Sequence, residues 1–331
     1  MENNSLSVQK NKSLYAKKFF VNYALYILIA VVIVIYAILA PVFVSASNIK
    51  ELLANSSPLL VCAIGMTFVL LIAEIDLSVG SIAGFSGALW LVASTAWGLP
   101  AGVATIIAIC GGAAIGLINA ALIAGLKINS FLVTLGMQVL VRGLVYLVSG
   151  GEQILTTPEI KNVINTDIFG GISILVIISI GLVIAMTIIY KYTSFGRKIQ
   201  AVGCNKAAAA KIGINVKKTY ASVFIMSGLF AGIAGIMQVG NLGMVNAAYV
   251  GNNLEFLAIT AAVLGGTSLF GGVGSVLPGT LIGVIFLMSI ENGLGILGAN
   301  PYIYPIVRGI VIYLAMFSDS LKRSIGTGRK L

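Results

Sequence analysis

The sequence contains no histidine, and charged residues make up only 9% of its 331 residues. A soluble domain carries roughly 25% charged residues, so this composition argues against a water-soluble enzyme of this length. Without histidine the chain can form neither a Ser-His-Asp triad nor an ordinary zinc site. Two of the three cysteines lie in apolar runs and the third lies in a basic loop, which argues against a disulfide framework.

Short motifs of nucleotide and metal chemistry are missing as well. The sequence has no GxxxxGK[ST] loop, no CxxC, no HExxH and no GxSxG, which are signatures of ATP binding, metal sites and nucleophilic hydrolases. An enzyme built from this chain would have to rely on carboxylates or lysines alone. We therefore expect a chain that is not an enzyme, with no catalytic residues, no metal site and no cofactor of its own.

Apolar residues dominate what is present. They make up 59% of the chain, and the mean hydropathy is +1.06. A helix needs about 20 apolar residues to cross a bilayer, so the sequence predicts an all-α integral membrane protein with about ten transmembrane helices. The predicted spans are residues 21–44, 53–73, 78–97, 101–125, 131–149, 170–190, 219–240, 254–271, 275–295 and 302–318.

The basic residues are concentrated in three short segments. Four, seven and four of the 20 Lys and Arg residues lie in residues 10–18, 191–218 and 322–330. Basic loops stay on the cytoplasmic side of the membrane, and an even number of spans places all three segments there. The predicted parts are a polar cytoplasmic tail over residues 1–20, a transmembrane domain over 21–318 with a cytoplasmic loop at about 191–218, and a basic cytoplasmic tail over 319–331.

Two similar stretches suggest an internal repeat. VRGLV at residues 141–145 resembles VRGIV at residues 307–311, about half a chain length further on. Five helices followed by five in inverted orientation is a known transporter plan. The match covers few residues, so chance similarity is the alternative interpretation.

Glycine occurs 39 times, often in pairs four residues apart. In lipid such spacing lets two helices approach closely, so tight helix packing is the first interpretation of these pairs. Examples are Gly80/Gly84, Gly112/Gly116, Gly228/Gly232 and Gly279/Gly283. The stretch 74–80 is different, because its polar residues predict a break between two helices, with Asp76 or Ser78 capping the second one.

The basic loop is predicted to contain a short helix. Asn205 is a good N-cap, the alanines after it favour helix, and Gly213 suits the position just past the helix end. A small-residue helix flanked by lysines could lie in the groove of a partner protein. An ordinary amphipathic loop is the alternative.

Four sequence blocks share a pattern with one family. Residues 203–214 read Gly-x-Asn-x-x-Ala-Ala-x-x-x-Gly-Ile, which resembles the coupling-helix motif of ABC importer permeases. Residues 75–81 (IDLSVGS), 129–143 and 254–272 resemble further blocks of the branch that carries monosaccharides. The sequence departs from the family pattern at Lys206 and Ala207, where many relatives are acidic, and at Ser130, where proline is frequent.

The resemblance implies a role and several partners. Such a permease forms a dimer, most simply a homodimer, in the bacterial inner membrane, and a separate ATPase chain binds the ATP and Mg. An extracytoplasmic binding protein delivers a pentose or hexose such as ribose. The residues that match the coupling motif are Asn205, Ala208, Ala209, Gly213 and Ile214.

Other polar residues are candidates for the substrate path or for docking. Arg142, Arg308 and Glu291 fall inside predicted spans, where they could line the path or pair with one another. Asp76 could line the path or cap a helix, and Glu255 could face the binding protein or be a solvated loop charge. The path candidates are Asp76, Ser78, Asn129, Thr134, Arg142 and Arg308.

Rival functions differ in the features they require. An ion-coupled secondary transporter would bind a proton at Glu74, Asp76 or Glu291, and it would not need the basic loop. A passive channel would act without ATP or a binding protein. Within the same family, a nucleoside or a signalling sugar is the alternative substrate.

Overall fold

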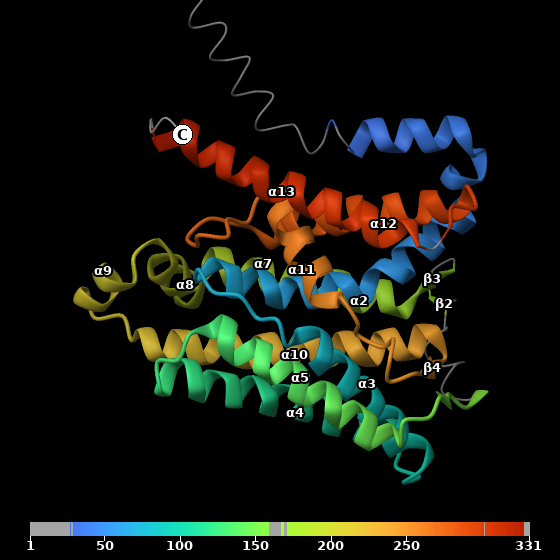
Figure 1. The fold of residues 1–331 in the computed structure, drawn as a ribbon, viewed down its shortest axis with the longest axis horizontal. Helices are drawn as coiled ribbons and strands as arrows, with labels where there is room; N and C mark the ends of the chain where they lie inside the picture. Colours follow the sequence, from blue (N-terminus) through green and yellow to red (C-terminus); the bar gives the residue numbers. More distant parts are fainter. Residues whose placement is uncertain (1–26, 28, 159–166, 169–170, 301, 328–331) are drawn as a thin grey trace, which may run out of the picture. The chain divides into compact units, whose positions relative to one another are not determined.

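Helices make up most of the described chain (Figure 1). A computed structural model describes residues 27, 29–158, 167–168, 171–300 and 302–327. The helices are Ile29–Leu39, η1 (Pro41–Val44), α2 (Ala46–Leu71), α3 (Val79–Thr95), α4 (Ala101–Ala120), η2 (Ala121–Gly125), α5 (Ser130–Ser149), α7 (Ile174–Tyr192), α8 (Ser194–Cys204), α9 (Lys206–Lys211), α10 (Val216–Leu242), α11 (Leu254–Leu264), η3 (Val276–Thr280), α12 (Leu281–Ile296) and α13 (Ile303–Thr327).

Four two-residue strands accompany the helices in the described residues. Strand β1 (Ile154–Leu155) pairs antiparallel with β4 (Met244–Val245), and β2 (Asp167–Ile168) pairs antiparallel with β3 (Ile172–Ser173). The pair β1–β4 ties the segment after α5 to the end of α10. The predicted all-α class is otherwise what the described residues show.

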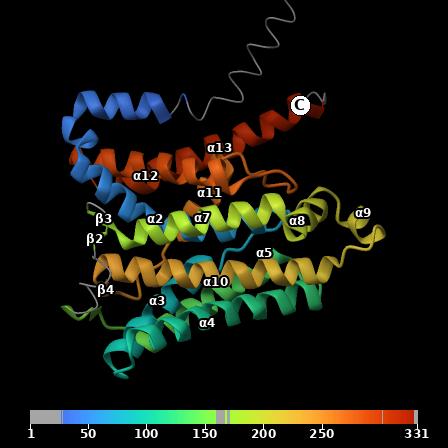
Figure 2. The ribbon, with the colours of Figure 1, turned by 180° about the vertical axis from the view of Figure 1, so that it is seen from behind.

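Two structural units can be distinguished, and each is described by itself. The large unit is Ala46–Met288, and the small unit combines Met1–Ser45 with Ser289–Leu331. In the large unit α10 packs against α2, α3 and α4, and Figures 1 and 2 show it running alongside α4. Phe68 on α2 and Phe224 on α10 are fully buried in this core.

Glycines set the spacing between α4 and α10. A β-carbon added at Gly112 would lie 2.6 Å from the carbonyl oxygen of Gly228, and one added at Gly116 would lie 2.5 Å from that of Phe224. Real side chains do not tolerate such distances, so the two helices touch through their backbones. The glycine pairs of residues 112/116 and 228/232 therefore pack against each other, which confirms the packing interpretation at this crossing.

Six helices of the described chain are long and apolar enough to cross a membrane. They are Ala46–Leu71, Ala101–Gly125, Ser130–Ser149, Ile174–Tyr192, Val216–Leu242 and Val276–Ile296. The shorter apolar helices Ile29–Leu39, Val79–Thr95, Leu254–Leu264 and Ile303–Leu314 lie within the other four predicted spans. Residues 21–26 of the first predicted span lie outside the described residues. The count of ten crossings and the inverted repeat stay predictions.

Two predicted boundaries differ from the structure. The predicted span 254–271 is wrong as a continuous helix, because α11 ends at Leu264 and Gly266 follows with φ +90°, a conformation that breaks a helix. The predicted end at residue 318 reflects only the apolar run. The α13 backbone continues to Thr327, since hydropathy does not mark where a helix stops.

Candidate functional site

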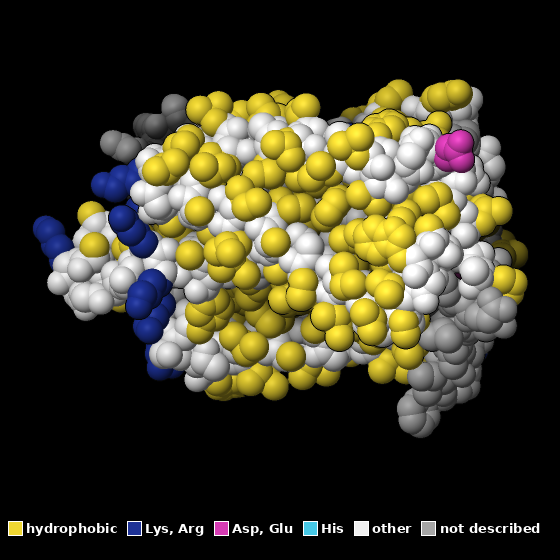
Figure 3. Space-filling view, turned by 90° about the horizontal axis from the view of Figure 1, so that it is seen from below, with side chains coloured by type: hydrophobic (Ala, Val, Ile, Leu, Met, Phe, Trp, Pro, Cys, Tyr) yellow, Lys and Arg dark blue, Asp and Glu magenta, His cyan; other side chains and the backbone are white. Residues whose placement is uncertain are grey.

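The basic loop forms one end of the large unit. Helices α8 and α9 and the start of α10 carry most of its lysines and arginines. In Figure 3 blue side chains gather at this end, while the magenta side chain visible on that face lies at the opposite end. Under the positive-inside rule such an end is expected at the cytoplasmic surface, which stays a prediction.

Both ends of α9 are fixed by the residues that the sequence analysis named. The Asn205 side chain accepts a hydrogen bond from the Ala208 N–H at 2.9 Å. At the other end Gly213 has φ +84°, and its N–H bonds to the Ala210 carbonyl. The N–H of Ile214 bonds to the Ala209 carbonyl at 3.1 Å. These two bonds form a Schellman motif, so the predicted cap, helix and end are confirmed.

The small residues of α9 point in different directions. Ala209 is buried against the protein, whereas Ala208 is exposed. No atom of the described chain lies within 4 Å of a β-carbon placed on Gly213. The outer face of α9 is thus small and unobstructed, as a surface that fits a partner's groove needs to be.

A cavity of about 700 Å³ lies beneath α9. Its wall is formed by η2, the start of α5, α9 and the start of α10, and it includes Glu74, Asn129, Ser130, Lys206 and Tyr220. Asn129 also caps α5, because its side chain accepts the N–H of Phe131 at 2.9 Å. Of the predicted path residues, Asn129 is therefore placed at a cavity whose lining includes both polar and apolar side chains.

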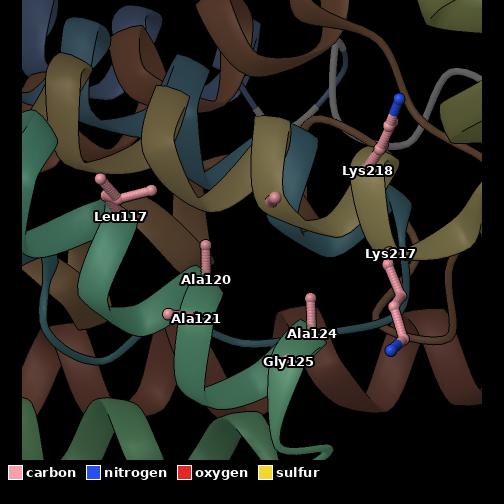
Figure 4. A pocket seen from close by; sticks show the side chains of 8 residues that line it. Leu117, Ala120, Ala121, Ala124, Gly125, Lys217 and Lys218 are labelled. Carbon is pink, nitrogen blue, oxygen red and sulfur yellow. The ribbon is translucent and has the colours of Figure 1, made fainter.

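A smaller groove of about 280 Å³ lies between η2 and the start of α10 (Figure 4). Alanines and Gly125 line most of it, and Lys217 and Lys218 stand at one end. Figure 4 shows Lys217 pointing toward the η2 side and Lys218 pointing away. The groove is almost wholly apolar and carries none of the predicted path residues.

Asp76 is the centre of a buried polar cluster between α2 and α3. It has no exposed surface, and its Oδ1 accepts hydrogen bonds from the N–H and hydroxyl of Ser78. Its Oδ2 accepts from the Ser227 hydroxyl of α10 at 2.8 Å. Asn119 of α4 donates to the Ser78 hydroxyl at 2.9 Å. The predicted break exists, and this closed bonding favours the capping and bracing role of Asp76 over contact with substrate.

Thr134 belongs to the same region. It is fully buried, and its hydroxyl bonds to the Ser130 carbonyl at 2.9 Å and lies 3.4 Å from the Ile75 carbonyl. The residue thereby ties α5 to the break between α2 and α3. Ser78 is also fully buried and makes no side-chain cap bond, so the capping acceptor is Asp76.

Arg142 and Glu255 lie in a second polar cluster, in which Glu255 is buried and Arg142 is half-buried. Arg142 donates to the carbonyls of Val250 at 2.6 Å and Ala247 at 3.3 Å. Gln138 donates to Glu255 Oε1 at 2.8 Å, while Glu255 Oε2 is buried without a hydrogen-bond partner in the described chain. Glu255 is 2% exposed, whereas a docking residue must be accessible. This burial corrects the predicted surface position of Glu255, because the side chain points into the unit from the first turn of α11.

Arg308 pairs with Glu291 within the small unit. Its Nε lies 2.6 Å from one carboxylate oxygen and its terminal nitrogen 2.9 Å from the other. Such a bidentate pair satisfies both charges. The interpretation that Arg308 fixes a helix through Glu291 is confirmed, and the geometry gives no support to a separate path role.

One contact had no clear signal in the sequence. The Tyr220 hydroxyl donates to Glu74 Oε1 at 2.8 Å, and the Ser130 hydroxyl donates to Glu74 Oε2. Glu74 lay in the predicted break, but nothing marked Tyr220 or Ser130 as its partners. Among the described residues, no group of three Cys, Asp or Glu side chains could hold a metal ion.

Comparison with known proteins adds the decisive observation. A family model described as "Branched-chain amino acid transport system / permease component" matches residues 48–316. The chain belongs to this permease family. The ribose import permease RbsC of Escherichia coli K12 is 36% identical to this chain. The match covers 90% of this chain and 93% of RbsC. No solved structure matches the permease.

Two further relatives are named for other sugars. The L-arabinose ABC transporter permease AraH of Azospirillum brasilense is 34% identical over 90% of this chain and 88% of its own length. The xylose transport permease XylH of Haemophilus influenzae is 32% identical over 91% of this chain and 97% of its own length. The resemblance found in the four sequence blocks is therefore confirmed. The permease is a multi-pass membrane protein and a transport subunit, not an enzyme.

Proposed function

We propose that this chain is the membrane-spanning subunit of an ATP-driven importer for a monosaccharide. The observation that carries the proposal is the capped helix α9, which presents a small, open face among lysines at one end of the large unit. An ion-coupled carrier has no need of such a helix. The relatives named for ribose, arabinose and xylose support a pentose or hexose as the substrate.

The motifs that the sequence lacks indicate which functions belong to partner chains. The sequence has no P-loop, so ATP and Mg belong to a partner ATPase that docks on α9. The proposed docking residues are Asn205, Ala208, Gly213 and Ile214, while the buried Ala209 packs α9 against the protein. An extracytoplasmic binding protein delivers the sugar at the opposite face of the membrane.

The assembly completes the proposal. Two copies of the chain form the translocation path, each with ten crossings in the bacterial inner membrane and with both termini in the cytoplasm. Asn129, one of the predicted path residues, lines the cavity beside α9. A neutral sugar needs such amide and hydroxyl partners, and the alternative is another small polar solute carried by the same kind of path.

Affinity purification of the tagged chain from its native membrane tests the partners. Mass spectrometry of the copurified proteins is expected to find a P-loop ATPase and a sugar-binding protein. The binding protein can then be titrated with candidate sugars to identify the substrate. Recovery of the chain without an ATPase would contradict the importer and favour an ion-coupled carrier.

Replacing Gly213 with valine tests the docking helix. A β-branched residue is strained at φ +84°, at a cost of about 1–3 kcal/mol, so the Schellman end of α9 should open. We expect normal membrane insertion and at least about tenfold less copurified ATPase, measured by quantitative mass spectrometry.

The matched control is Gly181→Val. Gly181 lies within α7 and has no positive φ, and a β-carbon added there would meet no atom of the described chain within 4 Å. The normal amount of ATPase should copurify with this variant. Normal copurification and normal substrate-stimulated hydrolysis with Gly213→Val would show that α9 is not the docking helix.

A further inference from the structure

We propose that Tyr220 and Glu74 are the positioning residues that transmit movement of α9 to the break between α2 and α3. The inference rests on the proposed function, because it takes α9 as the element that the ATPase moves. It adds the route by which that movement reaches the membrane interior. The route runs from Lys206 over Tyr220 to Glu74 and on to Ser130.

The first step joins α9 to α10. The Lys206 ammonium nitrogen lies 4.2 Å from the centre of the Tyr220 ring, within the range of a cation–π interaction. Lys206 is the first residue of α9, whereas Tyr220 is 4% exposed in the first turns of α10. A surface helix is thus connected to a buried side chain of the core.

The second step joins α10 to the break. The Tyr220 hydroxyl donates to Glu74 Oε1 at 2.8 Å and lies 3.4 Å from the Ile72 carbonyl. Ser130, at the start of α5, donates to the other carboxylate oxygen of Glu74. One carboxylate therefore holds α10, α5 and the non-helical segment that leads to Asp76. Moving Tyr220 or Glu74 must shift that segment or break a bond.

The cavity explains why this link, and not close packing, carries the movement. About 700 Å³ of open space separates α9 from η2 and the start of α5. On that side α9 can be displaced without pushing packed side chains. The competing route runs through α8, where Gly203 lies directly against the Leu71 carbonyl. If the movement passes through Gly203, removing the Tyr220 hydroxyl has no effect on coupling.

Tyr220→Phe removes the hydroxyl and keeps the ring under Lys206. In proteoliposomes of the copurified complex we expect the ATPase to remain bound and its hydrolysis to stay within about twofold of normal. Sugar uptake per ATP hydrolysed should fall about tenfold, the loss expected for one hydrogen bond to a carboxylate. The matched control is Tyr192→Phe, since Tyr192 is 75% exposed, and it should couple normally.

Lys206 provides a rescue series. Lys206→Gln should uncouple hydrolysis from uptake. Lys206→Arg should keep the two coupled, because arginine also binds an aromatic face. Tyr220→Phe with Lys206→Gln should be no worse than the more severe single variant, since steps in series are not additive. Full additivity overturns the proposal. Loss of the bound ATPase in Tyr220→Phe also overturns it, because the role is then merely structural.

Hydrogen exchange separates failure of the link from failure of the proposed function. In the purified chain without ATPase, Lys206→Gln should speed amide exchange in residues 72–78 at least about threefold, and Lys206→Arg should not. Unchanged exchange there overturns the link whatever the chain transports. Faster exchange together with no ATP-driven uptake by the unmodified complex would support the link and reject the importer.

Discussion

Replacing Gly228 with valine is expected to destabilise the large unit strongly. The new β-carbon would meet the Gly112 carbonyl and lie 3.0 Å from the Gly116 backbone. Neither contact is with a flexible side chain, so α4 and α10 must separate. Overpacking of this kind costs about 3 kcal/mol or more, which corresponds to a fall of about 10 °C in the unfolding temperature. Thermal unfolding in detergent and the yield of monodisperse protein measure the effect.

Gly181→Val is the matched control for this prediction also. The substitution and the helical setting are the same, but space is open around residue 181. Its unfolding temperature should stay within about 2 °C of normal. An unfolding temperature of Gly228→Val that equals that of the control would show that α4 and α10 do not cross at these glycines.

Replacing Asp76 with alanine is expected to have the second large effect. The change leaves the Ser227 hydroxyl and both the N–H and the hydroxyl of Ser78 buried without their acceptor. Each unsatisfied group costs about 1–3 kcal/mol, so the loss should be about 3–9 kcal/mol. Uptake should be lost with it, because the break between α2 and α3 loses its brace to α10. Unfolding temperature and uptake are measured on the same preparation.

Asp76→Asn separates bracing from substrate contact. The amide oxygen keeps one acceptor, and the Ser227 hydroxyl can turn to accept from the amide nitrogen. We therefore expect near-normal stability and measurable uptake. If Asp76→Ala is as stable as the unmodified chain yet does not transport, Asp76 contacts the substrate and the bracing account is wrong.

Local structure was the part most accessible from sequence. Asn205 and Gly213 predicted the two ends of α9 because capping depends on residues close together in the chain. The break at Asp76 was visible for the same reason. Gly112 and Gly228 predicted close packing through their spacing, although the sequence did not say which helices meet.

Contacts between residues far apart in the chain could not be predicted from the sequence. Tyr220 and Glu74 are 146 positions apart, and a tyrosine near a helix start carries no sign of its partner. Glu255 was placed at the surface because a glutamate in a first turn is ordinarily solvated. Its burial with Gln138 depends on how α5 packs beside α3, which no single-sequence pattern specifies. The end of α11 was missed because the apolar run continues beyond its glycines.

Sugar uptake by the reconstituted complex tests the central claim most directly. The chain, its copurified ATPase and binding protein are placed in proteoliposomes, and uptake of labelled ribose and other sugars is followed with ATP or with a pH gradient alone. The importer predicts uptake only when ATP, the ATPase and the binding protein are all present. Uptake driven by a pH gradient through the chain alone would contradict it and identify an ion-coupled carrier.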